Sequence, residues 1–253
     1  MANPEKWHQR FVQQARWTES VRRFLFQQAG LEHARGLLEV GCGTGAILGE
    51  IAHQTGARLV GIDIQQDYLH FAHSHGIAAA YAAADALHLP FADGVFSITC
   101  CHFFLLWVEH PLQALLEMKR VTAPGGYVLA MAEPDYGGRI DHPAALGELG
   151  RRQGQSLSHH GADPLVGRKL KSFIHKAGLR MVQAGVLGGQ WSEPPTQLEW
   201  ESEWDTLESD LSGEISTAEL AELKRLDFSA WRKGERILYV PTFYAWGQVN
   251  PTP

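Results

Sequence analysis

The chain has 253 residues, of which 45% are hydrophobic and 20% are charged. This length and composition are typical of a soluble globular protein with one large core, and they exclude a disordered chain and a fibrous repeat. The 22 Lys and Arg residues against 28 Asp and Glu residues give a net charge of −6, which disfavours a nucleic-acid partner.

Neither the cysteines nor the histidines form a recognisable cross-link or metal-binding pattern. Cys42 and the adjacent Cys100 and Cys101 are too few for a disulfide framework. None of the 13 histidines is grouped with carboxylates at ligand spacing. The N-terminus is polar, and no apolar run approaches the roughly 20 residues of a membrane span. We therefore expect a cytoplasmic protein with no membrane association and no metal centre.

The first half of the chain alternates between helical and strand patterns. Residues 5–30 have apolar side chains at helical spacing before Gly30, so we expect an N-terminal helical cap over residues 1–35. Short apolar strands then alternate with helices, a pattern that predicts a parallel sheet covered on both faces. The expected strands lie at 37–40, 58–63, 77–84, 95–101 and 127–132, and the expected helices at about 45–55, 66–75 and 111–122.

After about residue 134 the pattern becomes less regular. A helix over about 164–177 and a strand near 179–187 are followed by an acidic stretch, residues 199–222, with nine Asp or Glu and no Lys or Arg. Apolar side chains at helical spacing in this stretch indicate a solvated helix and not a docking tail. A single last strand from Ile237 to Trp246 is expected to close the fold.

We interpret residues 135–235 as a helical insertion that covers the substrate. The insertion is rich in tryptophan, which suits a flat or apolar small molecule but equally suits an ordinary core. The tryptophans concerned are Trp191, Trp200, Trp204 and Trp231.

A glycine cluster follows the first expected strand. Gly41, Gly43 and Gly45 stand between that strand and the next helix. Glycine lets the backbone turn sharply and approach a ligand closely, and the following helix N-terminus offers free N–H groups. Because open parallel sheets bind ligands at the carboxyl ends of their strands, this loop predicts a binding site.

Two ligand classes fit the loop. Gly41, Gly43 and Ala46 satisfy the dinucleotide fingerprint of NAD(P)-binding proteins. The stretch from Glu39 to Gly45 equally fits a loop that binds a nucleoside, and Asp63 suits ribose hydroxyls in both cases. Glu39 discriminates between them, because a carboxylate here suits an ammonium group and repels a pyrophosphate.

Further motifs follow this loop in a fixed order over about residues 36–134. Together they strongly resemble the type 11 domain of class I S-adenosylmethionine-dependent methyltransferases. The resemblance implies a three-layer, Rossmann-like α/β fold over residues 36–253, with a seven-stranded, mostly parallel sheet whose last strand is antiparallel. The motifs are Ala84-Asp85-Ala86, Leu89-Pro90-Phe91-Ala92-Asp93, Glu117 to Arg120-Val121 and Pro124-Gly125-Gly126.

The resemblance also implies which residues hold the S-adenosylmethionine cofactor. The glycines wrap its methionine part, and Glu39 supports its ammonium group. Asp63 binds the ribose hydroxyls, Ile64 packs on the adenine, and Asp85 accepts from the adenine amino group. The full implied set is Glu39, Gly41, Cys42, Gly43, Gly45, Asp63, Ile64, Asp85, Ala86 and Cys101.

The reacting methyl group should face the carboxyl ends of the fourth and fifth strands. His102 is the candidate general base because an imidazole titrates near neutral pH, and the alternative is a histidine bonded into the pocket wall. The candidate substrate contacts are Trp17, Glu133, Asp135 and Tyr136. For Glu133 the alternative is a hydrogen bond to loop backbone, and for Trp17 it is packing of the first helix on the sheet.

These observations predict transfer of a methyl group from S-adenosylmethionine to a small-molecule acceptor, with S-adenosylhomocysteine as product. An NAD(P)-binding oxidoreductase and a non-catalytic S-adenosylmethionine-binding protein remain as alternatives. The net charge opposes RNA as the acceptor. The sequence predicts neither the atom that is methylated nor the oligomeric state.

Overall fold

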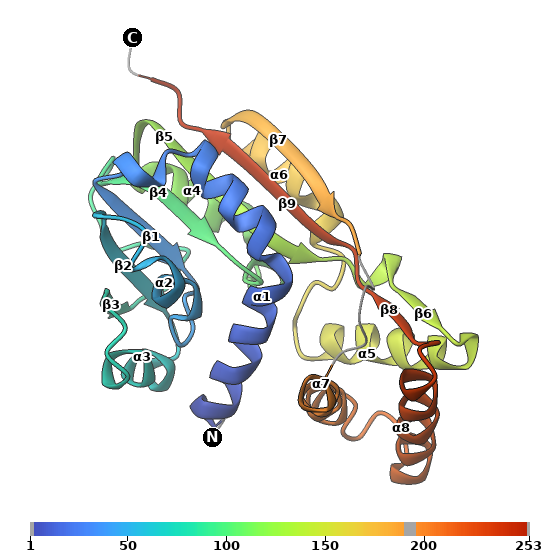
Figure 1. Cartoon of the computed structure of the whole chain (residues 1–253). Coiled ribbons are helices and arrows are strands. Elements are labelled where there is room, and N and C mark those ends of the chain that lie inside the picture. Colours follow the sequence, from blue (N-terminus) through green and yellow to red (C-terminus); the bar gives the residue numbers. More distant parts are fainter. Residues whose placement is uncertain (1–2, 190–195, 252–253) are drawn as a thin grey trace.

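The computed structural model describes residues 3–189 and 196–251, so Trp191 lies outside the described residues. A seven-stranded sheet in the order β3-β2-β1-β4-β5-β9-β7 forms its centre (Figure 1). β9 runs antiparallel to both of its neighbours, and the other pairs are parallel. This confirms the expected fold class. The strands are β1 (Gly36–Val40), β2 (Arg58–Asp63), β3 (Ala80–Ala83), β4 (Phe96–Cys101), β5 (Thr122–Pro134), β7 (Arg180–Leu187) and β9 (Thr242–Gln248).

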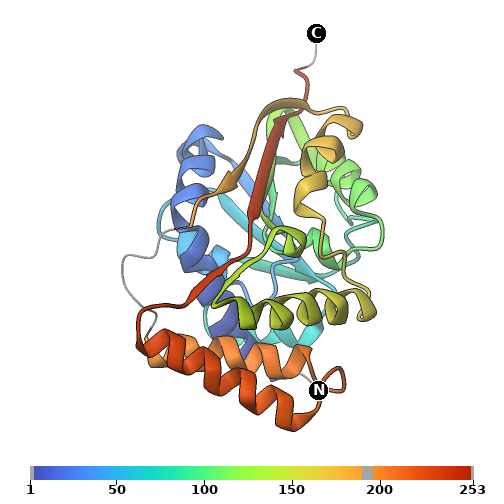
Figure 2. The same cartoon turned by 90° about the vertical axis from the view of Figure 1, so that its right-hand side faces the viewer.

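Helices cover both faces of this sheet, because its central strands bury apolar side chains on both sides. One face packs against α1 (Pro4–Gln28), α2 (Ala46–Ile51) and α3 (Gln66–Ser74). The other packs against α4 (Pro111–Val121) and α6 (Leu170–Lys176). Figure 2 shows α1 on one side of the sheet and α4 with α6 on the other.

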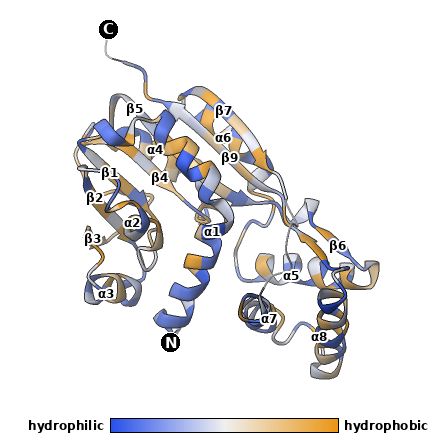
Figure 3. Ribbon diagram, in the orientation of Figure 1, coloured by the Kyte–Doolittle hydropathy of each residue, from blue (hydrophilic) through white to orange (hydrophobic). Residues whose placement is uncertain are grey.

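The helix α1 is held by polar as well as apolar contacts. It is coloured mostly hydrophilic in Figure 3, yet Arg10, Gln13, Thr18 and Arg22 on it are all buried. A buried polar side chain is costly unless it is hydrogen-bonded, so each of these residues points to a specific partner. Those partners determine where α1 sits over the carboxyl ends of the strands.

A second, smaller layer lies beyond the carboxyl ends of the sheet strands (Figures 1 and 2). It consists of α5 (Gly147–His159), α7 (Gln197–Asp210), α8 (Thr217–Arg232) and the antiparallel pair β6 (Ile140–His142) and β8 (Ile237–Tyr239). Its core buries Leu149, Trp204, Leu207 and Leu211. The acidic stretch is therefore largely helical with buried apolar residues, as the sequence predicted, but residues 211–216 divide it between α7 and α8. The remaining elements are short 3-10 turns at Leu31–His33, Leu105–Trp107, Tyr136–Gly138, Ala144–Leu146 and Gly167–Lys169.

The C-terminal half differs from the sequence-based expectation in two respects. The single last strand is wrong, because it is divided into β8 in the small sheet and β9 in the large sheet. Pro241 lies at the division, where it has no N–H to continue a ladder. The stretch 135–235 is also not one continuous cover, since α6 and β7 return to the main body. Among residues 3–189 and 196–251, no helix combines the length and apolar character that a membrane crossing requires.

Candidate functional site

The loop between β1 and α2 can be built only with glycine at three positions. Gly41, Gly43 and Gly45 have φ values of 71°, 51° and 77°, in the left-handed region that L side chains rarely adopt. A Cβ on Gly41 would lie 2.1 Å from the ring of Phe104, and one on Gly43 would lie 2.8 Å from the ring of Phe11. The loop is therefore packed closely between two aromatic rings.

Backbone bonds hold this loop against β2. The N–H groups of Gly41 and Cys42 both donate to the Ile62 carbonyl, each at 2.9 Å. The Asp63 side chain that follows accepts at Oδ2 from the Gly43 N–H, at 2.8 Å, and at Oδ1 from the Gln65 N–H, at 2.9 Å. The two motifs predicted to bind one nucleoside are therefore physically connected, and each carboxylate oxygen retains a lone pair for a ligand hydroxyl.

Glu39 has an unsatisfied oxygen at the glycine loop. It is 2% exposed at the end of β1, and its Oε2 has no hydrogen-bond partner among the described residues. Burial raises the pKa of Glu39 to about 8, and the positive charge of Arg22 opposes this shift. A buried acid with a free oxygen fits a cationic group, so the residues present suit the ammonium end of S-adenosylmethionine.

The remaining predicted cofactor residues lie in the glycine loop, on the loops after β2 and β3, and at the end of β4. Asp85 accepts from the Leu87 N–H at 2.9 Å, and Ala86 follows it. Ile64 is 72% exposed, which leaves an apolar surface beside Asp63. The Cys42 and Cys101 side chains are buried, and burial raises the pKa of both thiols, so only their backbone atoms are suited to contact a ligand.

His102 follows β4 directly and faces α1. Its Nε2 lies 2.7 Å from the Thr18 Oγ1. Burial lowers the pKa of His102 well below its usual value, and the positive charge of Arg22 lowers it further. The imidazole is therefore neutral at physiological pH, as a general base must be before it accepts a proton.

Glu133 organises the loop that follows His102. Its carboxylate accepts from the N–H groups of Phe104 at 3.0 Å, Leu105 at 2.8 Å and Leu106 at 3.3 Å. Burial raises the pKa of Glu133 to about 7, although these three bonds oppose the shift. This geometry corresponds to the backbone-bonding alternative and leaves Glu133 little freedom to contact a substrate.

The other three candidate substrate residues lie near α1 or near the start of the smaller layer. Asp135 is buried and forms a two-point ion pair with Arg168. The Tyr136 hydroxyl lies in a charged environment that includes Arg10, and burial raises the pKa of Tyr136 to about 12. Trp17 is 51% exposed, with the Arg10 guanidinium 4.8 Å from the centre of its ring. Arg10 is thus a common neighbour of Trp17 and Tyr136.

Several residues of α1 and of the loop after β4 belong to this site but were not predicted. Phe11 and Phe104 pack on the glycine loop, and His8 Nδ1 lies 2.9 Å from the Thr44 Oγ1. Thr18 contacts His102 from α1. The sequence offered only a weak indication of these contacts. Polar residues recur at helical spacing along α1, but such a pattern indicates a buried polar face only when the residues that they contact are known.

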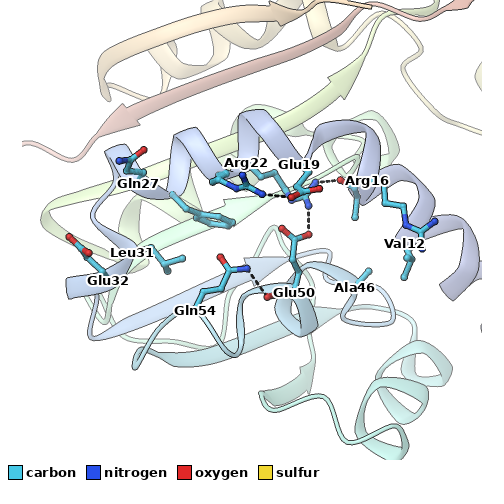
Figure 4. Close-up of a pocket in the computed structure, with 13 residues that line it drawn as sticks. Val12, Arg16, Glu19, Arg22, Gln27, Leu31, Glu32, Ala46, Glu50 and Gln54 are labelled. Carbon is cyan, nitrogen blue, oxygen red and sulfur yellow. Dashed lines mark hydrogen bonds and ion pairs between the residues drawn. The ribbon is translucent and has the colours of Figure 1, made fainter. Parts of the chain in front are cut away.

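A cavity of about 770 Å³ lies along the groove between α1 and α2, separate from the glycine loop (Figure 4). None of the ten predicted cofactor residues lines it. Figure 4 shows Arg22 and Glu50 pointing toward one another, and they form an ion pair. No three His, Cys, Asp or Glu side chains within residues 3–189 and 196–251 are grouped so as to hold a metal ion.

The tryptophans of the smaller layer pack with one another. Trp200 and Trp204 both donate from Nε1 to Asp227 Oδ2, at 2.6 and 2.8 Å. Trp204 is 1% exposed, and Trp231 stacks on Trp200 with ring centres 6.2 Å apart. Of the two interpretations given to these residues, ordinary core is the one that this packing favours.

Comparison with known proteins gives a family match for part of the chain. A family profile described as a methyltransferase domain matches residues 38–130. The chain is 28% identical to "Methyltransferase GfsG" of Streptomyces halstedii, over 65% of this chain and 60% of that protein. The matched regions span 29% to 60% of the first three curated relatives, so the chain covers less than two thirds of each.

Solved structures share the fold at low sequence identity. One is the [4+2]-cyclase SpnF, with a TM-score of 0.61, 19% identity, and coverage of 94% of this chain and 82% of that one. Another is geranyl diphosphate methyltransferase in complex with S-adenosylmethionine, with a TM-score of 0.57, 15% identity, and coverage of 92% and 85%. These likenesses show the fold, and the profile match identifies residues 38–130 as a methyltransferase domain.

Proposed function

We propose that this protein binds S-adenosylmethionine and transfers its methyl group to a small-molecule acceptor, releasing S-adenosylhomocysteine. The observation that carries the proposal is the buried Glu39 carboxyl beside the glycine loop, whose Oε2 has no hydrogen-bond partner within residues 3–189 and 196–251. A buried polar atom without a partner costs free energy, so its presence points to a ligand that completes it. An ammonium group would do so, whereas the pyrophosphate of a dinucleotide would not.

Each part of the cofactor has a suitable group on the chain. Glu39 would hold the ammonium, the backbone of the glycine loop would hold the methionine part, and Asp63 would accept from the ribose hydroxyls. The exposed Ile64 and the Asp85 carboxylate would hold the adenine. When bound, S-adenosylmethionine supplies a methyl group that its sulfonium already activates.

The chain then has to place an acceptor in line with that methyl group and exclude water. We assign the acceptor to the carboxyl ends of β4 and β5, between His102 and the loop at Tyr136, with Trp17 on α1 as a further wall. His102 would take a proton from an acceptor hydroxyl or carbon acid. Asp135 would support this wall through its ion pair with Arg168.

Calorimetric titration of the purified protein with S-adenosylmethionine, S-adenosylhomocysteine and NADH in parallel tests the cofactor assignment. We expect the first two to bind and NADH to show no heat of binding. Binding of NADH alone would overturn the assignment of Glu39 and would favour an oxidoreductase.

A second experiment separates an enzyme from a cofactor-binding protein. Acceptor libraries are screened with S-adenosylmethionine that carries a labelled methyl group, using the wild type and His102→Ala. We expect turnover in the wild type, and a loss in the variant that is much larger than its loss of cofactor affinity. An equal loss of both would make His102 a wall residue, and binding without turnover of any acceptor would favour the non-catalytic alternative.

A further inference from the structure

We infer that Thr18 and Arg22 are positioning residues that fix the neutral ring of His102 in one tautomer, with the proton on Nε2 and the lone pair on Nδ1. The lone pair on Nδ1 is then the one available to an acceptor. This inference deepens the proposed function and rests on it, because it assumes that His102 serves as the base. The contact itself joins α1 to the end of β4 across 84 positions of the sequence.

The three side chains form a continuous buried contact. Thr18 is 1% exposed and Arg22 is fully buried, and both lie on α1. Arg22 donates from Nη1 to the Thr18 Oγ1 and to the Ala15 carbonyl, and from Nη2 to the Glu50 carboxylate on α2. The Thr18 Oγ1 lies 2.7 Å from the His102 Nε2. Thr18 therefore has fixed polar neighbours on both sides.

Counting donors and acceptors at Thr18 favours one arrangement. A hydroxyl has one proton to donate and two lone pairs. Both Gln14 O and Ala15 O lie 3.2 Å from the Thr18 Oγ1 and can accept its proton. The lone pairs then accept from Arg22 and from an Nε2–H of His102, so every group is used. With the opposite tautomer Thr18 would donate to His102, one lone pair would stay empty, and one hydrogen bond fewer would form.

The charges around the ring are compatible with this arrangement. Arg22 is paired with Glu50, which offsets its field at the ring, while burial keeps His102 neutral. A neutral imidazole has one N–H and one lone pair. The hydrogen bond found for the His102 ring among the described residues is made by Nε2 and not by Nδ1, and the residue as a whole is partly exposed. The lone pair on Nδ1 is therefore the one that remains free.

The test is the tautomer itself, read by long-range ¹H–¹⁵N correlation NMR on protein labelled with ¹⁵N-histidine. His102→Gln identifies the His102 signals among the 13 histidines by their loss. In the wild type we expect Nε2 to resonate as a protonated nitrogen and Nδ1 as a nitrogen with a free lone pair. The reverse pattern in the wild type would overturn the inference without any variant being needed.

Two variants, one without the hydroxyl and one that keeps it, test the part played by Thr18. Thr18→Val removes the hydroxyl and is nearly isosteric, so we expect a mixture of tautomers, whereas Thr18→Ser keeps the hydroxyl and should restore the single Nε2–H form. A single Nε2–H form in Thr18→Val would show that Thr18 does not set it. Calorimetry with S-adenosylhomocysteine on the same samples keeps the two ideas separate. Failure of the wild type to bind it counts against the proposed function, whereas the tautomer pattern decides the positioning role.

Discussion

The glycine-loop region and the smaller helical layer differ in whether their buried polar groups have hydrogen-bond partners. Around β1 and β2, the Glu39 carboxyl has one buried oxygen that no described residue contacts by a hydrogen bond, and Ile64 exposes an apolar surface. In the smaller layer, the buried Asp227 carboxylate accepts from two tryptophan N–H groups and pairs with Arg236. Among the described residues, the first region leaves a buried polar atom without a partner, whereas the second satisfies the buried Asp227.

This difference indicates that the first region is suited to bind a ligand and that the second stabilises the fold. Unsatisfied buried groups are rare in native proteins, and their presence suggests a function. A fully connected buried network makes the structure specific and rigid. We therefore expect substitutions in the first region to change ligand affinity with little loss of stability, and substitutions in the second to do the reverse.

The largest effect is expected in the smaller layer. Asp227→Ala should lower the free energy of unfolding by about 3–5 kcal/mol, because it leaves the buried Arg236 without one of its partners and two tryptophan N–H groups without an acceptor. Urea denaturation measures this. The affinity for S-adenosylhomocysteine should stay within about twofold.

Asp205→Ala on α7 is the matched control for this variant. Asp205 pairs with Lys6, and the side chains are 51% and 59% exposed, so its loss should cost about 1 kcal/mol or less. A parallel loss of stability and cofactor affinity in Asp227→Ala would remove the contrast between the two regions.

Glu39→Gln should have the next largest effect, and it should act mainly on binding. It removes a charged acceptor from the expected ammonium site, so the affinity for S-adenosylhomocysteine should fall by about 1.5–3 kcal/mol, roughly 10- to 150-fold. The affinity for adenosine, which has no ammonium group, should not change. A loss for both ligands would mean that Glu39 supports the loop and does not contact the ammonium group.

Proton exchange on binding provides a sharper test of Glu39. With a pKa of about 8, the free protein holds this carboxyl mostly protonated at pH 7, and an ammonium ligand requires it ionised. Binding should release close to one proton at pH 7, and the affinity should rise about tenfold from pH 6 to pH 7. Calorimetry in buffers of different ionisation enthalpy measures the release, which should vanish in Glu39→Gln. Release of an equal proton by that variant would assign the titration elsewhere.

The same shift predicts how the free protein responds to pH. A carboxyl whose folded pKa lies above its ordinary value of 4.5 stabilises the fold fully below 4.5, and this contribution is lost as the pH rises through about 8. The pKa of Glu133, which burial raises to about 7, changes the stability in the same direction. Without ligand, the melting temperature should therefore fall as the pH rises between these values, and less steeply in Glu39→Gln.

The sequence predicted those site residues whose role depends on the neighbouring residues in the chain. Gly41, Gly43 and Gly45 could be predicted because a sharp turn between a strand and a helix favours glycine over residues with a side chain. Asp63 could be predicted because it ends a recognisable strand. The contact of Thr18 with His102 could not, because it depends on where α1 packs after the sheet has formed. Pro241 indicates locally that the last strand is divided. Nothing in the local sequence indicates that the two parts pair with different sheets.

The smallest effect concerns Asp63, where binding and loop support have to be separated. Asp63→Ala should weaken the binding of S-adenosylhomocysteine by more than about 1 kcal/mol, since it removes a charged acceptor for the ribose hydroxyls. Adenosine contains the same ribose, so its affinity should fall by the same factor, in contrast to Glu39→Gln. Asp67→Ala, an exposed carboxylate in the first turn of α3, serves as the control and should bind both ligands normally. Because Asp63 also accepts from the Gly43 N–H, a variant that loses S-adenosylhomocysteine but keeps adenosine would show that Asp63 acts by holding the glycine loop.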